Sequence, residues 1–304
     1  MQEKNVSSHL LPQKSYAFLG IIIGSLFVGM SPIFVRYSTV DPLAIGFFRF
    51  FFAVPFLWIW SISDTLKEKD STQHRIPRCA KDYLLLALAG MFFAIDIGIW
   101  HLSLLETTVM NSTLLNNMTP IFVTLISWLI LREKLTWQSV TGIVLAVLGT
   151  YLLITSDGSW GELHVYGDLM ALSSAVFFAG YVLIVKHLRH HLPAPTIMAW
   201  TSMSCMYFLA IMTFSRETNI IPTTFTDWLP LIGLALIVHV LGQTFIAISL
   251  KHLSATFSSL TMMIIPVVSA IFAWILFDET FTLLKIIGGV IILAGIIIAR
   301  QNEK

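Results

Sequence analysis

The feature that most constrains this chain is a series of apolar runs, each long enough to cross a lipid bilayer. A helix needs about 20 mostly apolar residues to span the hydrocarbon layer, and the chain contains ten such runs. They cover residues 16–35, 42–61, 83–104, 108–131, 137–155, 165–185, 194–214, 229–249, 254–277 and 281–299. None alternates between polar and apolar residues as a barrel strand does, and backbone groups in lipid must find partners within their own segment. We therefore predict an all-α membrane protein with ten transmembrane helices.

Composition supports this class and excludes others. Charged residues make up 12% of the chain, about half of the 25% found in soluble proteins. A formal net charge of +1 provides no basic surface for a nucleic acid. Two cysteines, Cys79 and Cys205, do not make a disulfide framework, and no apolar run has histidines at metal-ligand spacing. We predict no nucleic-acid partner, no cofactor and no metal.

The distribution of Lys and Arg predicts the orientation of the helices. With a cytoplasmic N-terminus, 14 of the 18 Lys and Arg residues fall in cytoplasmic segments, and only Arg36 and Arg216 fall in outside loops. Most of these loops are short, which is where the positive-inside rule is reliable. We place both termini in the cytoplasm, and we interpret the first run as a true span because no small-residue cleavage site follows it.

The chain also contains an internal repeat. When the sequence is shifted by 146 residues, the fourth and fifth runs fall on the ninth and tenth. The matching pairs are Pro120 with Pro266, Trp128 with Trp274, Glu133 with Glu279, Thr136 with Thr282, Gly142 with Gly288, and Gly149 with Gly295. The two members of each pair are five spans apart, an odd number, so the copies cross the membrane in opposite directions. Inverted repeats of this kind are typical of secondary transporters.

The repeat predicts how the chain is divided. Residues 1–15 are a cytoplasmic N-terminal tail, residues 16–155 the first repeat with spans 1–5, residues 156–300 the second repeat with spans 6–10, and residues 301–304 a cytoplasmic C-terminal tail. The predicted fold is therefore two inverted five-helix repeats.

The same regions resemble a known family. The resemblance rests on short motifs in both copies. They are Pro42 and Phe48-Arg49-Phe50 in the second span, NMTP at 117–120 and LREKLT at 131–136, with IP at 265–266 and DETFT at 278–282 in the second copy. With these motifs nearly the whole chain resembles the ten-helix EamA branch of the drug/metabolite transporter superfamily. The resemblance implies a secondary carrier of the bacterial inner membrane that moves amino acids, nucleosides, vitamins or other small metabolites, often outward. Arg49 has no symmetric partner in the second copy.

Few ionisable residues lie deep in the predicted spans, and Asp96 is the most telling of them. At a rise of 1.5 Å per residue it lies about 20 Å into the third span. A carboxylate at that depth is costly unless it is paired, hydrated or protonated, and such residues are functional by default. We predict that Asp96 binds substrate and couples transport to protons, and that Trp100, one turn further on the same face, stacks on the substrate. The alternative is that Asp96 only closes a hydrogen-bonded network between helices.

Arg49 is the predicted counter-charge of Asp96. The two residues lie at similar depths, so a salt bridge that breaks and re-forms between them would serve proton coupling. The alternative is an arginine at a helix end whose charge reaches the outer surface. His101 points roughly 140° away from Asp96, at 100° per residue, and is expected at the outer interface.

The fourth and ninth spans are predicted to be broken by proline. Pro120 frees the carbonyl of Asn116, and Pro266 frees that of Met262. Broken backbone at mid-membrane depth is tolerated only where it lines a cavity or is covered by protein. We predict that Asn116, Asn117 and Met262 line the substrate cavity. The alternative is that the amides join helices and the prolines are passive kinks.

The eighth span offers a second polar pair. His239 and Gln243 are spaced i, i+4 and are predicted to contact the substrate, although a histidine bonded to a neighbouring helix is an equal alternative. The basic run at 186–191 lies in a predicted inside loop, where contact with anionic lipid is expected in preference to metal binding.

Together these features predict a secondary transporter of small polar metabolites, with export as the expected direction. The substrate would bind near the midplane, and rocking of one repeat against the other would alternate its access. No GxxxxGK[ST] motif for direct use of ATP occurs, so a proton gradient is the simplest energy source and substrate exchange the competing one. The expected partners are a small-molecule substrate, the lipid bilayer and protons, with the chain acting as a monomer or weak homodimer.

Two other classes are less well supported. An intramembrane lipid-modifying enzyme needs acid, histidine or serine groups that converge near one membrane face, whereas the deep ionisable residues here are sparse and scattered. A channel needs a filter segment, and none is visible. We therefore do not predict an enzyme.

Overall fold

The computed structural model of the 304-residue chain describes residues 2–67, 76–107, 109–155, 165–215, 220–277 and 282–301, and every regular element in these ranges is a helix. The first repeat contains α1 (Gln2–Gly29), α2 (Ser31–Arg36), α3 (Pro42–Lys67), α4 (Ala80–Glu106), α5 (Val109–Asn116), α6 (Thr119–Ile126), η1 (Ser127–Leu131) and α7 (Trp137–Thr155). The second contains α8 (Val165–Leu188), α9 (Ala194–Phe214), η2 (Phe225–Asp227), α10 (Trp228–Gly233), η3 (Leu234–Gln243), α11 (Thr244–Ser249), α12 (Ala255–Met262), α13 (Ile264–Phe277) and α14 (Leu283–Arg300).

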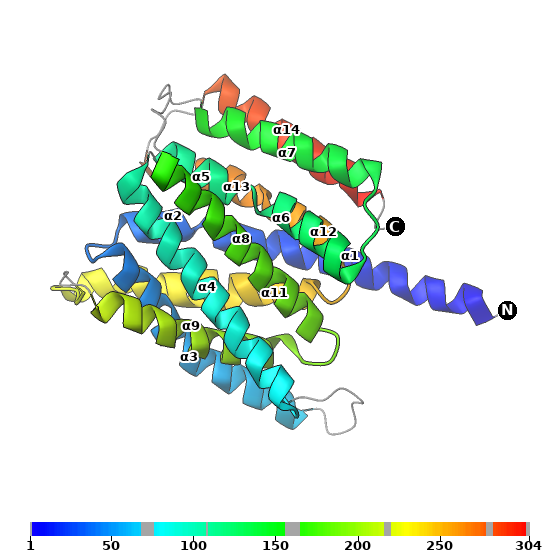
Figure 1. Ribbon diagram of the computed structural model, residues 1–304, viewed down its shortest axis with the longest axis horizontal. Helices are drawn as coiled ribbons and strands as arrows, with labels where there is room; N and C mark the ends of the chain where they lie inside the picture. The colour runs from blue at the N-terminus through cyan, green and yellow to red at the C-terminus, as the bar shows by residue number, and fades with distance from the viewer. Residues whose placement is uncertain are drawn as a thin grey trace.

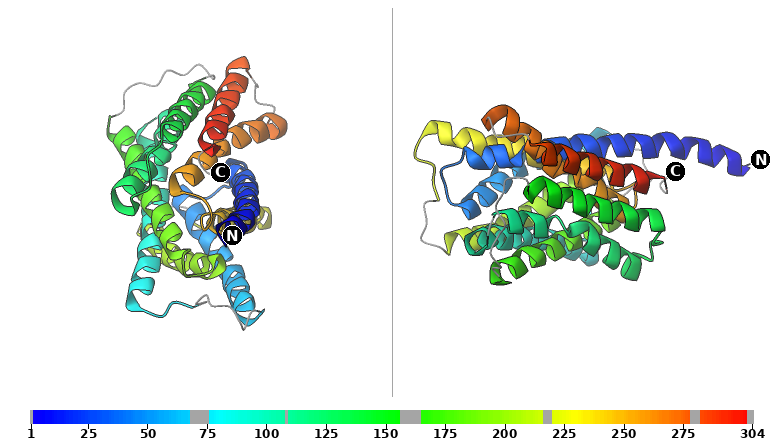
Figure 2. Two further views of the ribbon diagram at one scale, coloured as in Figure 1. Left: turned by 90° about the vertical axis from the view of Figure 1, so that its right-hand side faces the viewer. Right: turned by 90° about the horizontal axis from the view of Figure 1, so that it is seen from above.

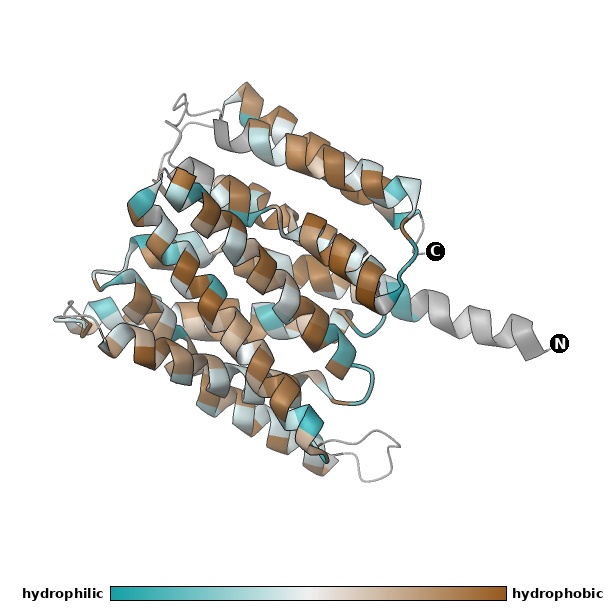
Figure 3. Cartoon of the chain, viewed as in Figure 1, coloured by the Kyte–Doolittle hydropathy of each residue, from teal (hydrophilic) through white to brown (hydrophobic). Residues whose placement is uncertain are grey.

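These elements form ten membrane-spanning helices. Within the described ranges, nine are long and apolar enough to cross a bilayer, and a tenth, Trp137–Leu152, is a shorter apolar helix. Apolar residues dominate the helices along their length (Figure 3), as a lipid environment requires. The predicted fold class is therefore confirmed. Helix α1 begins at Gln2, so most of the predicted N-terminal tail continues the first span as helix and projects from the bundle (Figure 1).

The helices pack in pairs that each join the two repeats. Helix α4 lies against α8, α1 against η3 and α11, α3 against α9, and α7 against α14. Figures 1 and 2 show the α7–α14 pair along one side of the bundle. Span 3 thus packs on span 6, and their repeat partners, span 8 and span 1, pack on each other in the same way. An internal two-fold axis that exchanges inverted copies produces this arrangement.

Glycines allow the α7–α14 pair to pack closely. A Cβ atom added to Gly149 would lie 2.6 Å from the carbonyl oxygen of Gly288, and one added to Gly142 would lie 2.8 Å from that of Gly295. Gly149 thus meets the repeat partner of Gly142, and Gly142 meets the repeat partner of Gly149. The two contacts are therefore related by the internal symmetry. Small residues at such crossings let helix backbones approach in membranes.

We expect Gly149→Ala to destabilise the protein by about 1–3 kcal/mol, because the added methyl group meets backbone that cannot move aside. Gly289→Ala in α14 is the matched control, since its Cβ would meet only Val267 at 3.4 Å, an ordinary contact. The measurement is the thermal unfolding midpoint of each variant in the same detergent. Equal midpoints for the two variants would show that the α7–α14 contact does not contribute to stability.

The two ends of the bundle differ in chemistry. We call the end formed by residues 132–136, 189–193 and 250–254 the basic end, and the other the opposite end. Helix α1 begins and α14 ends on the basic side, to the right in Figure 1. The repeat partners Trp128 and Trp274 are 51% and 50% exposed. Such half-exposed tryptophans are typical of the interface between a membrane and water.

Candidate functional site

A buried polar cluster surrounds Asp96 in α4. The Nδ2 atom of Asn116 donates to Asp96 Oδ1 at 3.2 Å and to the Ser174 hydroxyl at 2.8 Å. The side chains of Asp96 and Ser174 are 7% and 0% exposed. Because Ser174 belongs to α8 and the other two residues belong to α4 and α5, the cluster joins the two repeats. The structure thus places Asp96 and Asn116, both predicted as site residues, in direct contact.

The salt bridge that the sequence predicts between Arg49 and Asp96 is not formed. Among the described residues no ion pair joins them within 4.0 Å. Asp96 has the neutral amide of Asn116 as its donor instead, and the charge of Arg49 acts on it only through space. A neutral amide can donate a hydrogen bond to a buried carboxylate oxygen with the same geometry as a cation. Matching depths alone therefore did not identify Asn116 as the donor to Asp96.

Arg49 turns toward the core, and the alternative of a surface arginine is also wrong. Its Cζ atom lies 5.7 Å from the ring centre of Phe50 and 5.8 Å from that of Phe93. Both rings are buried. The Nε atom of Arg49 is buried and has no hydrogen-bond partner, whereas the residue as a whole keeps part of its surface accessible.

His239 lies against the same two rings. Its ring centre is 4.4 Å from that of Phe50 and 6.1 Å from that of Phe93. Nε2 is 2.7 Å from the Ser202 hydroxyl of α9, so the predicted bond to a neighbouring helix exists. The other nitrogen, Nδ1, is buried without a partner. One nitrogen therefore joins two helices, and the other has no hydrogen-bond partner among the described residues.

The eighth span departs from the α-helix assumed for His239 and Gln243. The structure has a π-helix, η3, over Leu234–Gln243, in which hydrogen bonds join residues i and i+5. In this wider helix the two residues still lie about one turn apart, and both are buried. No feature of the residue pattern predicts the π-helix. Its counterpart in α4 is regular, so here the repeats differ.

Trp100 and His101 lie beyond Asp96 in α4, and His101 corrects an expectation. Its side chain is only 7% exposed and its ring centre is 5.1 Å from that of Trp100, so it is not at the interface. Packing on this tryptophan outweighs the direction predicted from helix periodicity. The Nε1 atom of Trp100 and the Nδ1 atom of His101 are both buried without partners.

The two broken spans differ at their breaks. Helix α5 ends at Asn116, before Pro120, and α12 ends at Met262, before Pro266. The freed carbonyl of Asn116 accepts a bond from the Thr119 hydroxyl at 2.8 Å, which occupies one of its two lone pairs. The matching position in the second repeat is isoleucine, which offers no hydroxyl to the Met262 carbonyl.

Asn117 and Met262 are less directly connected to the polar cluster. The amide of Asn117 donates to the Thr113 carbonyl of its own helix at 2.8 Å, so it does not join Asn116 at Asp96. Met262 is buried within the protein at 6% exposure and does not face lipid.

Comparison with known proteins settles the family. A model of the EamA-like transporter family matches residues 15–155 and 165–301, one match for each repeat. The chain belongs to the EamA-like transporter family. A transporter of Methanothermobacter thermautotrophicus, itself uncharacterized, is 26% identical over 96% of this chain and 88% of its own length. The pseudopaline exporter CntI of Pseudomonas aeruginosa is 29% identical over 72% of this chain and 76% of its own. A crystal structure that is 17% identical superposes with a TM-score of 0.80 over 95% of this chain and 99% of that one, which shows the shared fold.

The basic end of this EamA transporter is fastened by Glu133. Arg132 adopts a left-handed conformation with φ of 55°, which turns the chain at the end of η1. Glu133 Oε1 then accepts from the amide of Ala255 at 3.0 Å, and Oε2 accepts from the amide and hydroxyl of Thr256 at 3.4 and 3.3 Å. Lys186 Nζ lies 3.8 Å from Glu133. The end of the fourth span is thereby joined to the start of the ninth.

The basic run at 186–191 contributes to the same closure and does not form the expected lipid contact throughout. Lys186 donates to the Leu253 carbonyl. Arg189 is 6% exposed, and it donates to the carbonyls of Ala247 and Leu192 at 2.9 and 2.6 Å. Burial lowers the pKa of Arg189 to about 10, so it stays charged at neutral pH. The described part of the transporter contains no group of three side chains that could hold a metal ion.

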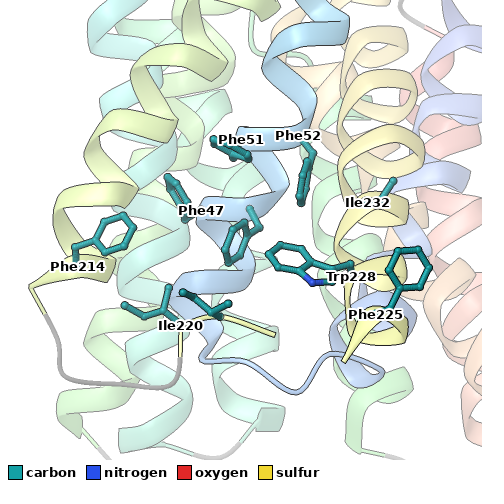
Figure 4. A pocket seen from close by; sticks show the side chains of 10 residues that line it. Phe47, Phe51, Phe52, Phe214, Ile220, Phe225, Trp228 and Ile232 are labelled. Atoms are coloured by element: carbon teal, nitrogen blue, oxygen red, sulfur yellow. The ribbon is translucent and has the colours of Figure 1, made fainter. Parts of the chain in front are cut away.

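The opposite end of the EamA transporter has an apolar cleft. Its volume is about 690 Å³, and it lies where α3, the end of α9 and α10 meet (Figure 4). The lining includes Phe47, Phe51, Phe52, Phe214 and Trp228. Near the middle of α9 the Ser204 hydroxyl donates to the Ala87 carbonyl of α4 at 2.8 Å. Polar contacts of Glu133 thus join the helices at the basic end, whereas aromatic side chains line a cleft at the opposite end.

Proposed function

We propose that this EamA transporter is a secondary carrier that binds one small polar metabolite beside Asp96, between its two repeats. The observation that carries the proposal is the polar cluster itself, because Asp96, Asn116 and Ser174 come from both halves of the chain. A site shared by inverted repeats is exposed to alternate sides when one repeat rocks against the other. The proposed location is the inner (plasma) membrane of a bacterium, with both termini cytoplasmic.

Proton coupling through Asp96 is the proposed energy source. A carboxylate fixed in a salt bridge gains and loses a proton with difficulty, because its cation favours the ionised form. Asp96 has only neutral hydrogen-bond partners, and an amide can donate or accept. The cluster therefore suits a group that changes protonation during a transport cycle.

Export is the proposed direction, and it draws support from the pseudopaline exporter of Pseudomonas aeruginosa, to which the chain is 29% identical. The substrate class proposed is a small polar metabolite similar in size to an amino acid, a vitamin or a nucleoside. The polar groups at the site fit such a solute better than a lipid tail. An intramembrane enzyme is not favoured, because the family and the relatives are transporters.

A release assay tests the carrier. The purified protein is reconstituted into liposomes loaded with a soluble metabolite extract of bacterial cells, and released solutes are quantified by mass spectrometry. We expect a small set of solutes to leave only when the protein is present, with a rate that saturates and rises when the same solute is added outside. A rate that grows without saturation would indicate a channel, chemically altered solutes would indicate an enzyme, and no release would contradict transport.

A further inference from the structure

Two neighbouring residues in the core of the transporter each have a buried polar atom without a hydrogen-bond partner. The atoms are Arg49 Nε and His239 Nδ1. Arg49 and His239 contact the same pair of rings, Phe50 and Phe93. Buried polar groups in native proteins are nearly always bonded, so atoms left without partners at one place indicate a ligand.

The chemistry of these atoms defines the ligand group. A guanidinium only donates hydrogen bonds. When His239 Nε2 accepts from the Ser202 hydroxyl, Nδ1 carries the proton and is a donor as well. The site therefore has donors and lacks acceptors. A ligand that fits it supplies oxygen atoms with lone pairs.

The charges near the site restrict the class of ligand further. Arg49 brings one positive charge that no ion pair among the described residues neutralises. Asp96 follows Phe93 by three residues in α4 and so lies on the same face as the ring that Arg49 contacts. A second negative charge on the ligand, as in a doubly charged phosphate, would be repelled by this carboxylate. A carboxylate carries one negative charge, and its two oxygens match the planar fork of a guanidinium.

We propose that Arg49 and His239 bind a carboxylate of the transported solute, which makes the substrate class small carboxylic acids and zwitterions. This inference rests on the proposed carrier function. Phe50 and Phe93 hold the guanidinium and the imidazole toward the bound group, and Ser202 positions the imidazole through Nε2. Asp96 then faces the remainder of the solute, so that solutes with a cationic or hydroxyl group near the carboxylate fit best.

The test uses the metabolite extract in two forms, untreated and with its carboxylates converted to methyl esters. We expect every solute released by the wild-type protein to bear a carboxylate, and release from the esterified extract to fall to the level of protein-free liposomes. Methyl esters keep the size of the solute but lose its negative charge. Release of solutes without a carboxylate, or equal release from both extracts, would overturn the carboxylate site alone. If the wild-type protein releases nothing from either extract, the carrier function itself has failed.

Variants of Arg49 locate the effect. We expect Arg49→Gln to reduce release of the carboxylates about 10- to 100-fold, because a hydrogen-bonded charge pair is lost. Arg49→Lys keeps the charge without the fork and should retain an intermediate rate. Arg36→Gln is the matched control, since Arg36 also lies over a phenylalanine ring, 4.1 Å from that of Phe277, but far from the site. Undiminished carboxylate release by Arg49→Gln would remove Arg49 from substrate binding.

His239→Phe separates binding from packing. The phenyl ring keeps the contact with Phe50 but removes both ring nitrogens. We expect release of carboxylates to fall about tenfold, with an unchanged elution volume on gel filtration as the check on folding. A rate equal to wild type would limit the proposed site to Arg49 and contradict the part assigned to the imidazole.

Discussion

Replacing Asp96 with asparagine is expected to reduce proton-driven uptake to the level of protein-free vesicles while exchange of substrate across the membrane continues. An asparagine oxygen can still accept the bond from Asn116, so the contact between α4 and α5 is kept. The asparagine side chain cannot bind or release a proton, so a pH gradient can no longer drive transport through this position. The measurement is uptake into proteoliposomes with an imposed pH gradient, next to counterflow of the same solute without one.

Asp82 provides a matched control for that experiment. It is an acid in the same helix, but it lies at the basic end, where its carboxylate is 3.0 Å from Nε2 of His191. We expect Asp82→Asn to retain proton-driven uptake. If Asp96→Asn also retains it, the carboxylate takes no part in coupling, and substrate exchange becomes the better account.

Replacing Glu133 with alanine is expected to open the basic end. The substitution removes three hydrogen bonds to the start of α12 and the ion pair with Lys186. Bonds to a charged group are each worth about 1.5–3 kcal/mol, so even partial loss would shift a balance between two states at least about tenfold. The transporter would spend less time closed at this end, and concentrative transport should fall.

The chain carries its own reporter for this opening. Cys205 in α9 is fully buried one turn after Ser202, and the exposed Cys79 can be replaced by serine. In that background we expect Glu133→Ala to raise the rate at which a maleimide added on the basic side labels Cys205. Glu106→Ala, at an exposed acid of the opposite end, should not change the rate. Equal labelling of all three proteins would mean that Glu133 does not hold this end closed.

The fold could be predicted because two of its determinants are visible in one dimension. The length of each apolar run sets the number of spans, and the matched prolines and glycines at 120 and 266, or 149 and 295, reveal the repeat. The cross-contact between Gly149 and Gly288 then follows from the symmetry. Such features depend on spacing along the chain and not on the details of packing.

The site was predicted only in part, because its geometry depends on rotation about the helix axes. Depth along a span placed Asp96 within reach of Arg49, but it did not identify Asn116 as the hydrogen-bond partner of Asp96. The direction of Arg49 is set by where the rings of Phe50 and Phe93 leave room, which no local pattern encodes. The bond between His239 and Ser202 agrees with one of the two roles predicted for His239, whereas the π-helix of the eighth span was not predicted.

The contrast between the two ends of the bundle has a consequence for how the surroundings regulate this carrier. Among the described residues, an ion pair between Lys186 and Glu133 joins helices at the basic end, whereas aromatic rings line the cleft at the opposite end. Ionic strength weakens the first kind of contact and leaves the second nearly untouched. For the proposed carrier we therefore expect dissolved salt to loosen the basic end and to leave the opposite end unchanged.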